Sequence, residues 1–148
     1  MRKVVLLSVT TFCIAGGCDS RTDQQKLQGE WLLFEMYGEF DFCPQPAKQD
    51  WLPTTMAFTA NEFRFTNGKG SRHNLVGTFD CDITHSPKQI TFVFDRRTII
   101  GIYDVSTTVL RVCIGEHDNK PPTEFNGGAP VFKTSRPALL LFKRAPKK

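Results

Sequence analysis

The sequence has no apolar run long enough to cross a membrane as a helix. Its longest, from Val4 to Ile14, holds eleven residues and would rise about 16 Å in a helix, whereas a hydrocarbon core is about 30 Å thick. An excess of one charge sign is also missing, because 19 basic and 15 acidic side chains leave a net charge of +4 and only the tail FKRAPKK clusters Lys and Arg. An anchoring transmembrane helix is therefore disfavoured, and there is no signature of nucleic-acid binding.

Motifs of catalysis and of metal binding are missing as well. There is no Ser-His-Asp order with a nucleophile elbow, and no glycine loop that would cradle a phosphate. His73, His85 and His117 lack the spacing of a zinc site. Two local clusters, DCD at 80–82 with His85 and EHD at 116–118, offer no closed set of ligands. We therefore expect no catalytic residues, no metal ion, no cofactor and no enzymatic activity.

The first 18 residues do have the parts of an export signal. Two basic residues precede the apolar stretch, and AGGC at 15–18 is similar to the lipobox of bacterial lipoproteins. On this interpretation residues 1–17 are a signal peptide that is removed, Cys18 is lipidated, and 18–25 is a polar tether. The predicted location is a bacterial cell-envelope membrane, on its periplasmic or surface side. The alternative is ordinary secretion, in which Cys18 has no special role.

Residues 26–148 are the length of one domain, and their pattern predicts short strands with no helix of useful length. A composition of 40% hydrophobic and 23% charged residues is ordinary for a globular protein. Most of the predicted strands are joined by short links, which favours an all-β fold: an eight-stranded antiparallel up-and-down barrel, with no open edge. The predicted strands are Glu30–Tyr37, Thr55–Ala60, Glu62–Thr66, Asn74–Ile83, Gln89–Asp95, Thr98–Val105, Thr107–Ile114 and Ala138–Arg144.

Phenylalanine is unusually frequent, with 13 residues. Strand alternation places six of these rings on one side of their strands, which makes them candidates for the barrel lumen. An eight-stranded barrel is just wide enough either to be filled by side chains or to hold one small ligand. Six large rings favour the filled barrel. These candidates are Phe58, Phe63, Phe65, Phe79, Phe92 and Phe94.

Three cysteines remain after removal of the leader and lipidation of Cys18: Cys43, Cys81 and Cys113. An exported protein meets an oxidising compartment, and an odd number of thiols leaves one without a partner in the chain. Alternation places Cys81 on the apolar side of its strand and Cys113 on the side of Arg111, so a bond between those two is disfavoured. A bond from Cys43 to one of the others, and three buried or unreactive thiols, are the open alternatives.

The predicted first strand opens with Gly29 and Trp31, and Gly-x-Trp at this position is the signature of lipocalin-like barrels. The chain more specifically resembles a lipocalin-like family of unknown function that is expanded in planctomycete bacteria. The matching elements span about 118 residues, and the segment 40–53 departs from the pattern. They are LQGEW (27–31), GTFDCDIT (77–84), PKQITFVF (87–94), GIY and VLRVC (101–113), PPTEF (121–125) and LLLFKR (139–144).

The resemblance implies a barrel fold and an envelope location, and it brings no catalytic or ligand residues. It also implies that a basic side chain near the end of the last strand, Lys143 or Arg144, stacks on Trp31. The plainer alternative is that both charges are solvated.

Two functions remain open. The first is an envelope-anchored, lipocalin-like lipoprotein domain that serves as a non-enzymatic interaction or structural module, with a largely filled barrel and an envelope protein as partner. The second is a carrier that binds a small apolar ligand in the barrel mouth.

Overall fold

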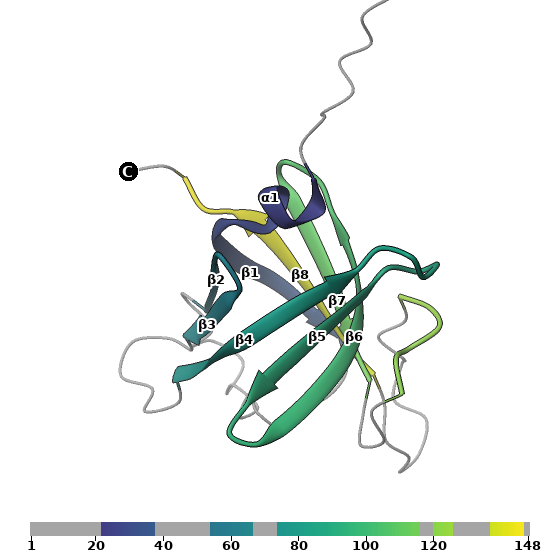
Figure 1. Cartoon of the computed structure of the whole chain (residues 1–148). Coiled ribbons are helices and arrows are strands. Elements are labelled where there is room, and N and C mark those ends of the chain that lie inside the picture. Colours follow the sequence, from purple (N-terminus) through teal and green to yellow (C-terminus); the bar gives the residue numbers. More distant parts are fainter. Residues whose placement is uncertain (1–21, 38–53, 67–73, 116–119, 126–136, 147–148) are drawn as a thin grey trace, which may run out of the picture.

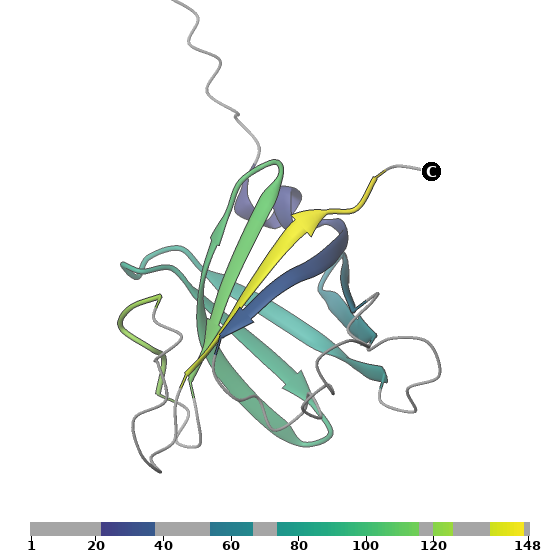
Figure 2. The ribbon, with the colours of Figure 1, turned by 180° about the vertical axis from the view of Figure 1, so that it is seen from behind.

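The computed structural model describes residues 22–37, 54–66, 74–115, 120–125 and 137–146. They form a short helix followed by eight strands, which pair in sequence order as a closed antiparallel barrel (Figures 1 and 2). This confirms the predicted all-β, up-and-down barrel. The elements are α1 (Asp23–Leu27), β1 (Gly29–Tyr37), β2 (Thr55–Thr59), β3 (Glu62–Thr66), β4 (Asn74–Asp82), β5 (Gln89–Phe94), β6 (Arg97–Val105), β7 (Val109–Ile114) and β8 (Ala138–Arg144).

Some strands end or begin at other residues than predicted, because side chains in the turns bind backbone N–H groups. β4 ends at Asp82 because its carboxylate accepts a hydrogen bond from the backbone N–H of Thr84, at 2.9 Å. β7 begins at Val109 because the hydroxyl of Ser106 accepts the backbone N–H of Val109, at 2.9 Å. The β5–β6 turn has positive φ at both Asp95 and Arg96, which is the conformation that suits a two-residue hairpin.

The barrel closes through pairing of β1 with β8, in which Trp31 lies opposite Arg144. The register shifts between Leu33 and Glu35, where Phe34 forms a bulge. Because of the extra residue, the inward positions are odd-numbered before the bulge and even-numbered after it. Leu33 is therefore buried, and Met36 packs against the core while Phe34 is exposed.

The helix α1 was not predicted, and it falls partly within the segment expected to be a tether. Thr22 caps it: the hydroxyl accepts the N–H of Gln25 at 3.3 Å, and the Gln25 side chain accepts the N–H of Thr22 at 3.0 Å. Its last residue, Leu27, is fully buried. The polar sequence here therefore includes one ordered turn that packs on the barrel.

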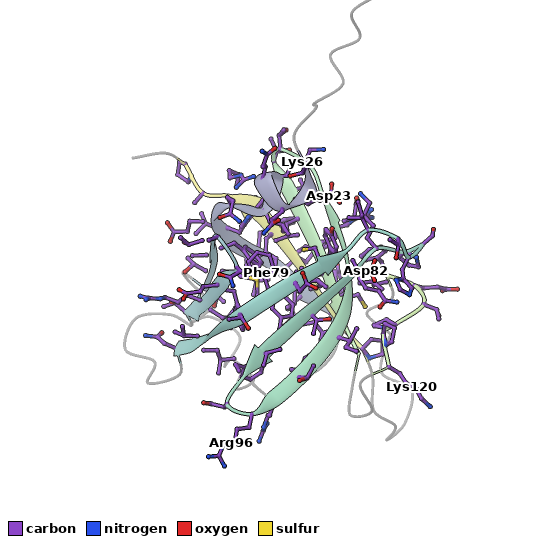
Figure 3. The ribbon with its side chains drawn as sticks, viewed as in Figure 1. Asp23, Lys26, Phe79, Asp82, Arg96 and Lys120 are labelled. Atoms are coloured by element: carbon purple, nitrogen blue, oxygen red, sulfur yellow. The ribbon has the colours of Figure 1, made fainter. Side chains whose placement is uncertain are left out.

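The two ends of the barrel differ. The end that α1 covers, called the closed end below, also holds the β2–β3 and β6–β7 turns, the start of β1 and the end of β8. The opposite end, called the open end, holds the β5–β6 turn with Arg96 (Figure 3).

Candidate functional site

Phenylalanine is the most frequent residue type in the barrel core among the described residues. All six lumen candidates belong to one core cluster, and each is between 1% and 6% exposed. Phe58 meets Phe79 edge-on with centroids 4.8 Å apart, and Phe63 meets Phe92 in the same manner at 4.9 Å. Edge-to-face pairs of this kind add about 0.5 to 1.5 kcal/mol to the gain from burial. Phe79 lies near the middle of the barrel (Figure 3). Phe58 pairs with Gly29 near the closed end and Phe94 lies beside the open-end turn, so the rings are spread along the height of the lumen.

One cavity lies toward the open end, next to these rings. Its empty space is about 310 Å³ when the part open to solvent is counted, but the room inside is only about 20 Å³, enough for about one water molecule. Small-molecule sites usually enclose about 300 to 1,000 Å³. Every residue that lines the cavity is apolar: Met56, Phe63, Phe65, Leu75, Phe92, Phe94, Ile99, Ile114 and Leu140.

The closed end is held together by two side chains that bind the last carbonyl groups of α1. The indole N–H of Trp31 donates to the carbonyl of Leu27 at 2.7 Å. The guanidinium of Arg144 lies 3.8 Å from the centre of the Trp31 ring and donates to the carbonyls of Gln28, at 2.6 Å, and of Lys26. Carbonyl groups at a helix end have no partner within the helix, so these bonds replace the missing ones. Of the two basic candidates, Arg144 is the one that stacks, whereas Lys143 is exposed.

Gly29 has a φ of +107°, a conformation that side chains rarely adopt. A Cβ at this position would lie 3.3 Å from Nη1 of Arg144. The glycine of the Gly-x-Trp signature therefore allows the chain to bend into β1 and leaves room for the arginine.

A polar cluster connects α1 to the barrel wall. The carboxylate of Asp23 accepts hydrogen bonds from the ammonium of Lys88 at 2.6 Å and from the hydroxyl of Tyr103 at 3.1 Å. Tyr103 is buried, and the burial, together with the charges of Cys81 and Asp23, raises its pKa. Burial likewise raises the pKa of the Cys81 thiol to about 11. A thiol with this pKa is protonated at neutral pH and is a poor nucleophile.

These contacts were not foreseen from the sequence, because their members lie 65 and 80 positions apart. Nothing in the local pattern around Lys88 or Tyr103 distinguishes them. The helix itself had a readable signal, since Thr22-x-x-Gln25 is a capping-box pattern.

The cysteines lie on opposite sides of the barrel wall. Cys81 packs against the lumen core, whereas Cys113 is the cross-strand partner of Ile102, and this pair is buried but does not belong to the core cluster. Cys81 and Cys113 are not joined to each other. Cys43 lies outside the described residues, as does Cys18.

Cys113 takes the side of β7 that Arg111 shares, as alternation predicts, and it is nevertheless buried. Residues 120–125 pass over β7 here, where the guanidinium of Arg111 lies 4.9 Å from the centre of the Phe125 ring. At Gly115, a Cβ would be 2.4 Å from the carbonyl oxygen of Lys120. Alternation shows which side of a strand a residue takes, but it does not show whether another segment, here 120–125, lies against that side.

No chemical centre is apparent within the described residues. They contain no group of three or more His, Cys, Asp and Glu side chains placed to hold a metal ion. His85 contacts Asp82 at 3.0 Å in an exposed turn, and hydrogen bonds from Thr84 lower the pKa of the Asp82 carboxyl. His73 and the EHD segment at 116–118 lie outside the described residues. In the same part of the chain, no helix is long and apolar enough to cross a membrane.

Comparisons of this chain with protein-family models, with curated proteins and with solved structures found no match.

Proposed function

We propose that this protein is an envelope-anchored, lipocalin-like lipoprotein domain that acts as a non-enzymatic interaction or structural module. The observation that supports it best is the content of the lumen: six buried phenylalanine rings and a cavity with room for about one water molecule. Among the residues that the structure describes, this cavity has no room for a drug-sized ligand unless side chains move. Its stable outer surface is then what it offers to an envelope partner.

The anchor rests on the leader sequence, in which AGGC at 15–18 follows an apolar stretch. Acylation of Cys18 would give the mature chain two or three acyl chains, which is enough for stable membrane attachment. The lipocalin-like character is supported by the closed end, where Trp31 is covered by Arg144 and Gly29 takes a positive φ.

Fractionation and mass spectrometry test the anchor. The mature protein should sediment with membranes and carry acyl chains on Cys18, and Cys18→Ala should release it. Cys13→Ala is the matched control, because Cys13 lies in the leader and its replacement should leave the protein on the membrane. A soluble protein with an unmodified N-terminus would exclude the lipoprotein proposal.

A carrier is the second candidate, and the entirely apolar lining of the open-end cavity favours it. Phe79 and Phe92 separate the two functions, because only Phe92 lines the cavity. For a filled barrel, truncating either ring to Ala should cost about 3 to 5 kcal/mol, since a void is left in the core. Phe34→Ala, at a position 51% exposed, is the control and should cost far less.

Chemical denaturation measures the stability of each variant, and titration with an apolar fluorescent probe measures ligand binding. The filled module predicts a large loss for Phe79→Ala and Phe92→Ala and weak probe binding by the wild type. Saturable, stoichiometric binding by the wild type, with little destabilisation in Phe92→Ala, would instead establish the carrier.

A further inference from the structure

We infer that the anchor orients the barrel, so that its closed end faces the membrane and its open end, with the cavity, faces the aqueous compartment. The inference rests on the proposed acylation of Cys18. It identifies the surface that meets lipid and the side from which a partner or an apolar ligand arrives.

The first step is the length of the connection. Cys18 precedes Thr22, the capping residue of α1, by four positions. Four residues span at most about 14 Å when fully extended. The start of α1 must therefore stay within about 14 Å of the lipid-bearing residue.

The second step is that α1 cannot serve as additional tether while its contacts hold. Its Asp23 binds Lys88 at 2.6 Å, Leu27 is fully buried, and its final carbonyls are bound by Trp31 and Arg144. Without these contacts, the eleven residues from Cys18 to Gly29 could reach about 38 Å. Docking of α1 on the barrel therefore shortens the linker, which would otherwise be long enough to allow any orientation of the barrel.

The third step compares this reach with the height of the barrel. β6 runs from Arg97, beside the open-end turn, to Val105, and α1 packs against this strand. Nine residues at about 3.3 Å each, tilted by about 40° as in barrels, give a height of about 23 Å. A tether of about 14 Å cannot pass along that height, so the open end cannot turn to the bilayer.

Lysine side chains near the closed end and the open end of the barrel can be labelled chemically to test this orientation. Lys26 lies in the last turn of α1 at the closed end, and Lys120 lies at the opposite end of the molecule (Figure 3). Lys143, exposed near the end of β8, is a second reporter for the closed end. The orientation predicts that lipid-borne reagents reach Lys26 and Lys143 and spare Lys120.

The test uses the acylated full-length protein in phospholipid vesicles that contain a lipid with an amine-reactive headgroup. Mass spectrometry measures the lipid adduct at each lysine, and a water-soluble reagent of the same chemistry gives the intrinsic reactivity. The ratio of Lys26 to Lys120 adducts, corrected for intrinsic reactivity, should lie well above unity. Equal modification of the two lysines, or preference for Lys120, would overturn the orientation.

A tether variant is the matched control. Inserting 24 Gly/Ser residues between Ser20 and Arg21 gives the connection to Thr22 a root-mean-square length of about 29 Å, which exceeds the barrel height. The corrected ratio should fall toward unity while acylation and sedimentation stay unchanged. A ratio that does not fall would reject tether length as the cause.

The same samples distinguish this inference from the proposed function. If Cys18 carries no acyl chains, the anchor and the orientation are both wrong. If the acyl chains are present and Lys120 is modified as readily as Lys26, only the orientation is wrong.

Discussion

Arg144 contacts several separate segments at the closed end. Its guanidinium covers Trp31 and donates to carbonyls of Lys26, Gln28 and Thr107, so a single side chain joins α1, the β6–β7 turn and β1. A partly desolvated cation on an indole contributes about 1 to 2 kcal/mol, and hydrogen bonds from a charged donor contribute about 1.5 to 3 kcal/mol. The contacts share one side chain, so their contributions do not simply add.

Arg144→Ala should therefore lower the free energy of unfolding by about 2 to 4 kcal/mol. Lys143→Ala is the control: its side chain is exposed, and the loss should stay within about 0.5 kcal/mol. Urea denaturation followed by tryptophan fluorescence, to which Trp31 and Trp51 both contribute, measures both losses. Equal losses in the two variants would show that the stack and its hydrogen bonds contribute nothing specific.

Two glycines within the strands, Gly77 and Gly101, have no room for a side chain. At Gly77 in β4, a Cβ would lie 2.1 Å from the carbonyl oxygen of Val93 and 2.9 Å from the Phe63 ring. At Gly101 in β6, it would lie 2.7 Å from the carbonyl oxygen of Cys113. Both obstacles are backbone atoms of strands that are paired on both sides, so they cannot move away cheaply.

Gly77→Ala should destabilise the fold by about 3 kcal/mol, the upper end of what overpacking costs. Thr78→Ala, one position along and exposed, removes a side chain without crowding a neighbour and should cost less than about 1 kcal/mol. Thermal unfolding by circular dichroism compares the two. A Gly77→Ala variant as stable as the wild type would show that β4 and β5 separate there without strain.

For the molecule as a whole, the half-buried thiol of Cys81 and the buried phenol of Tyr103 make the free energy of unfolding depend on pH in the alkaline range. Burial raises the pKa of Cys81 to about 11 and also raises that of Tyr103, so the folded state holds both protons more tightly than the unfolded chain. The unfolded thiol releases its proton near pH 8.5 and the unfolded phenol near pH 10, by ordinary values. The stabilisation is therefore complete below about pH 8.5 and is lost as the pH rises toward the folded pKa values.

Urea midpoints measured from pH 6 to 10.5 should be flat up to about pH 8 and then decline. A Cys81→Ser, Tyr103→Phe double variant should start from a lower midpoint and decline less steeply above pH 8.5, because neither group is left to titrate. If the urea midpoint declines equally steeply with pH in the two proteins, groups other than Cys81 and Tyr103 cause the decline.

Much of the architecture follows from alternation along the chain. A side-chain period of two assigns every residue of a strand to one face, and eight such strands with short links were enough to predict the closed barrel, which the structure confirms. The Phe58 to Phe94 rings take the lumen side for the same reason. Both features depend on residues that are close together in the sequence, so the local pattern is enough to predict them.

The contacts at the closed end could not be predicted from the sequence, because the residues that make them are far apart in the chain. Sequence alone left Lys143 and Arg144 as alternatives, and only the register of β8 against β1 puts Arg144 opposite Trp31. The bulge at Phe34 and the docking of α1 through Asp23 and Lys88 are of the same kind. The local pattern predicts which face of a strand a residue takes. What packs against that face depends on closure of the barrel, which brings together segments up to 118 positions apart.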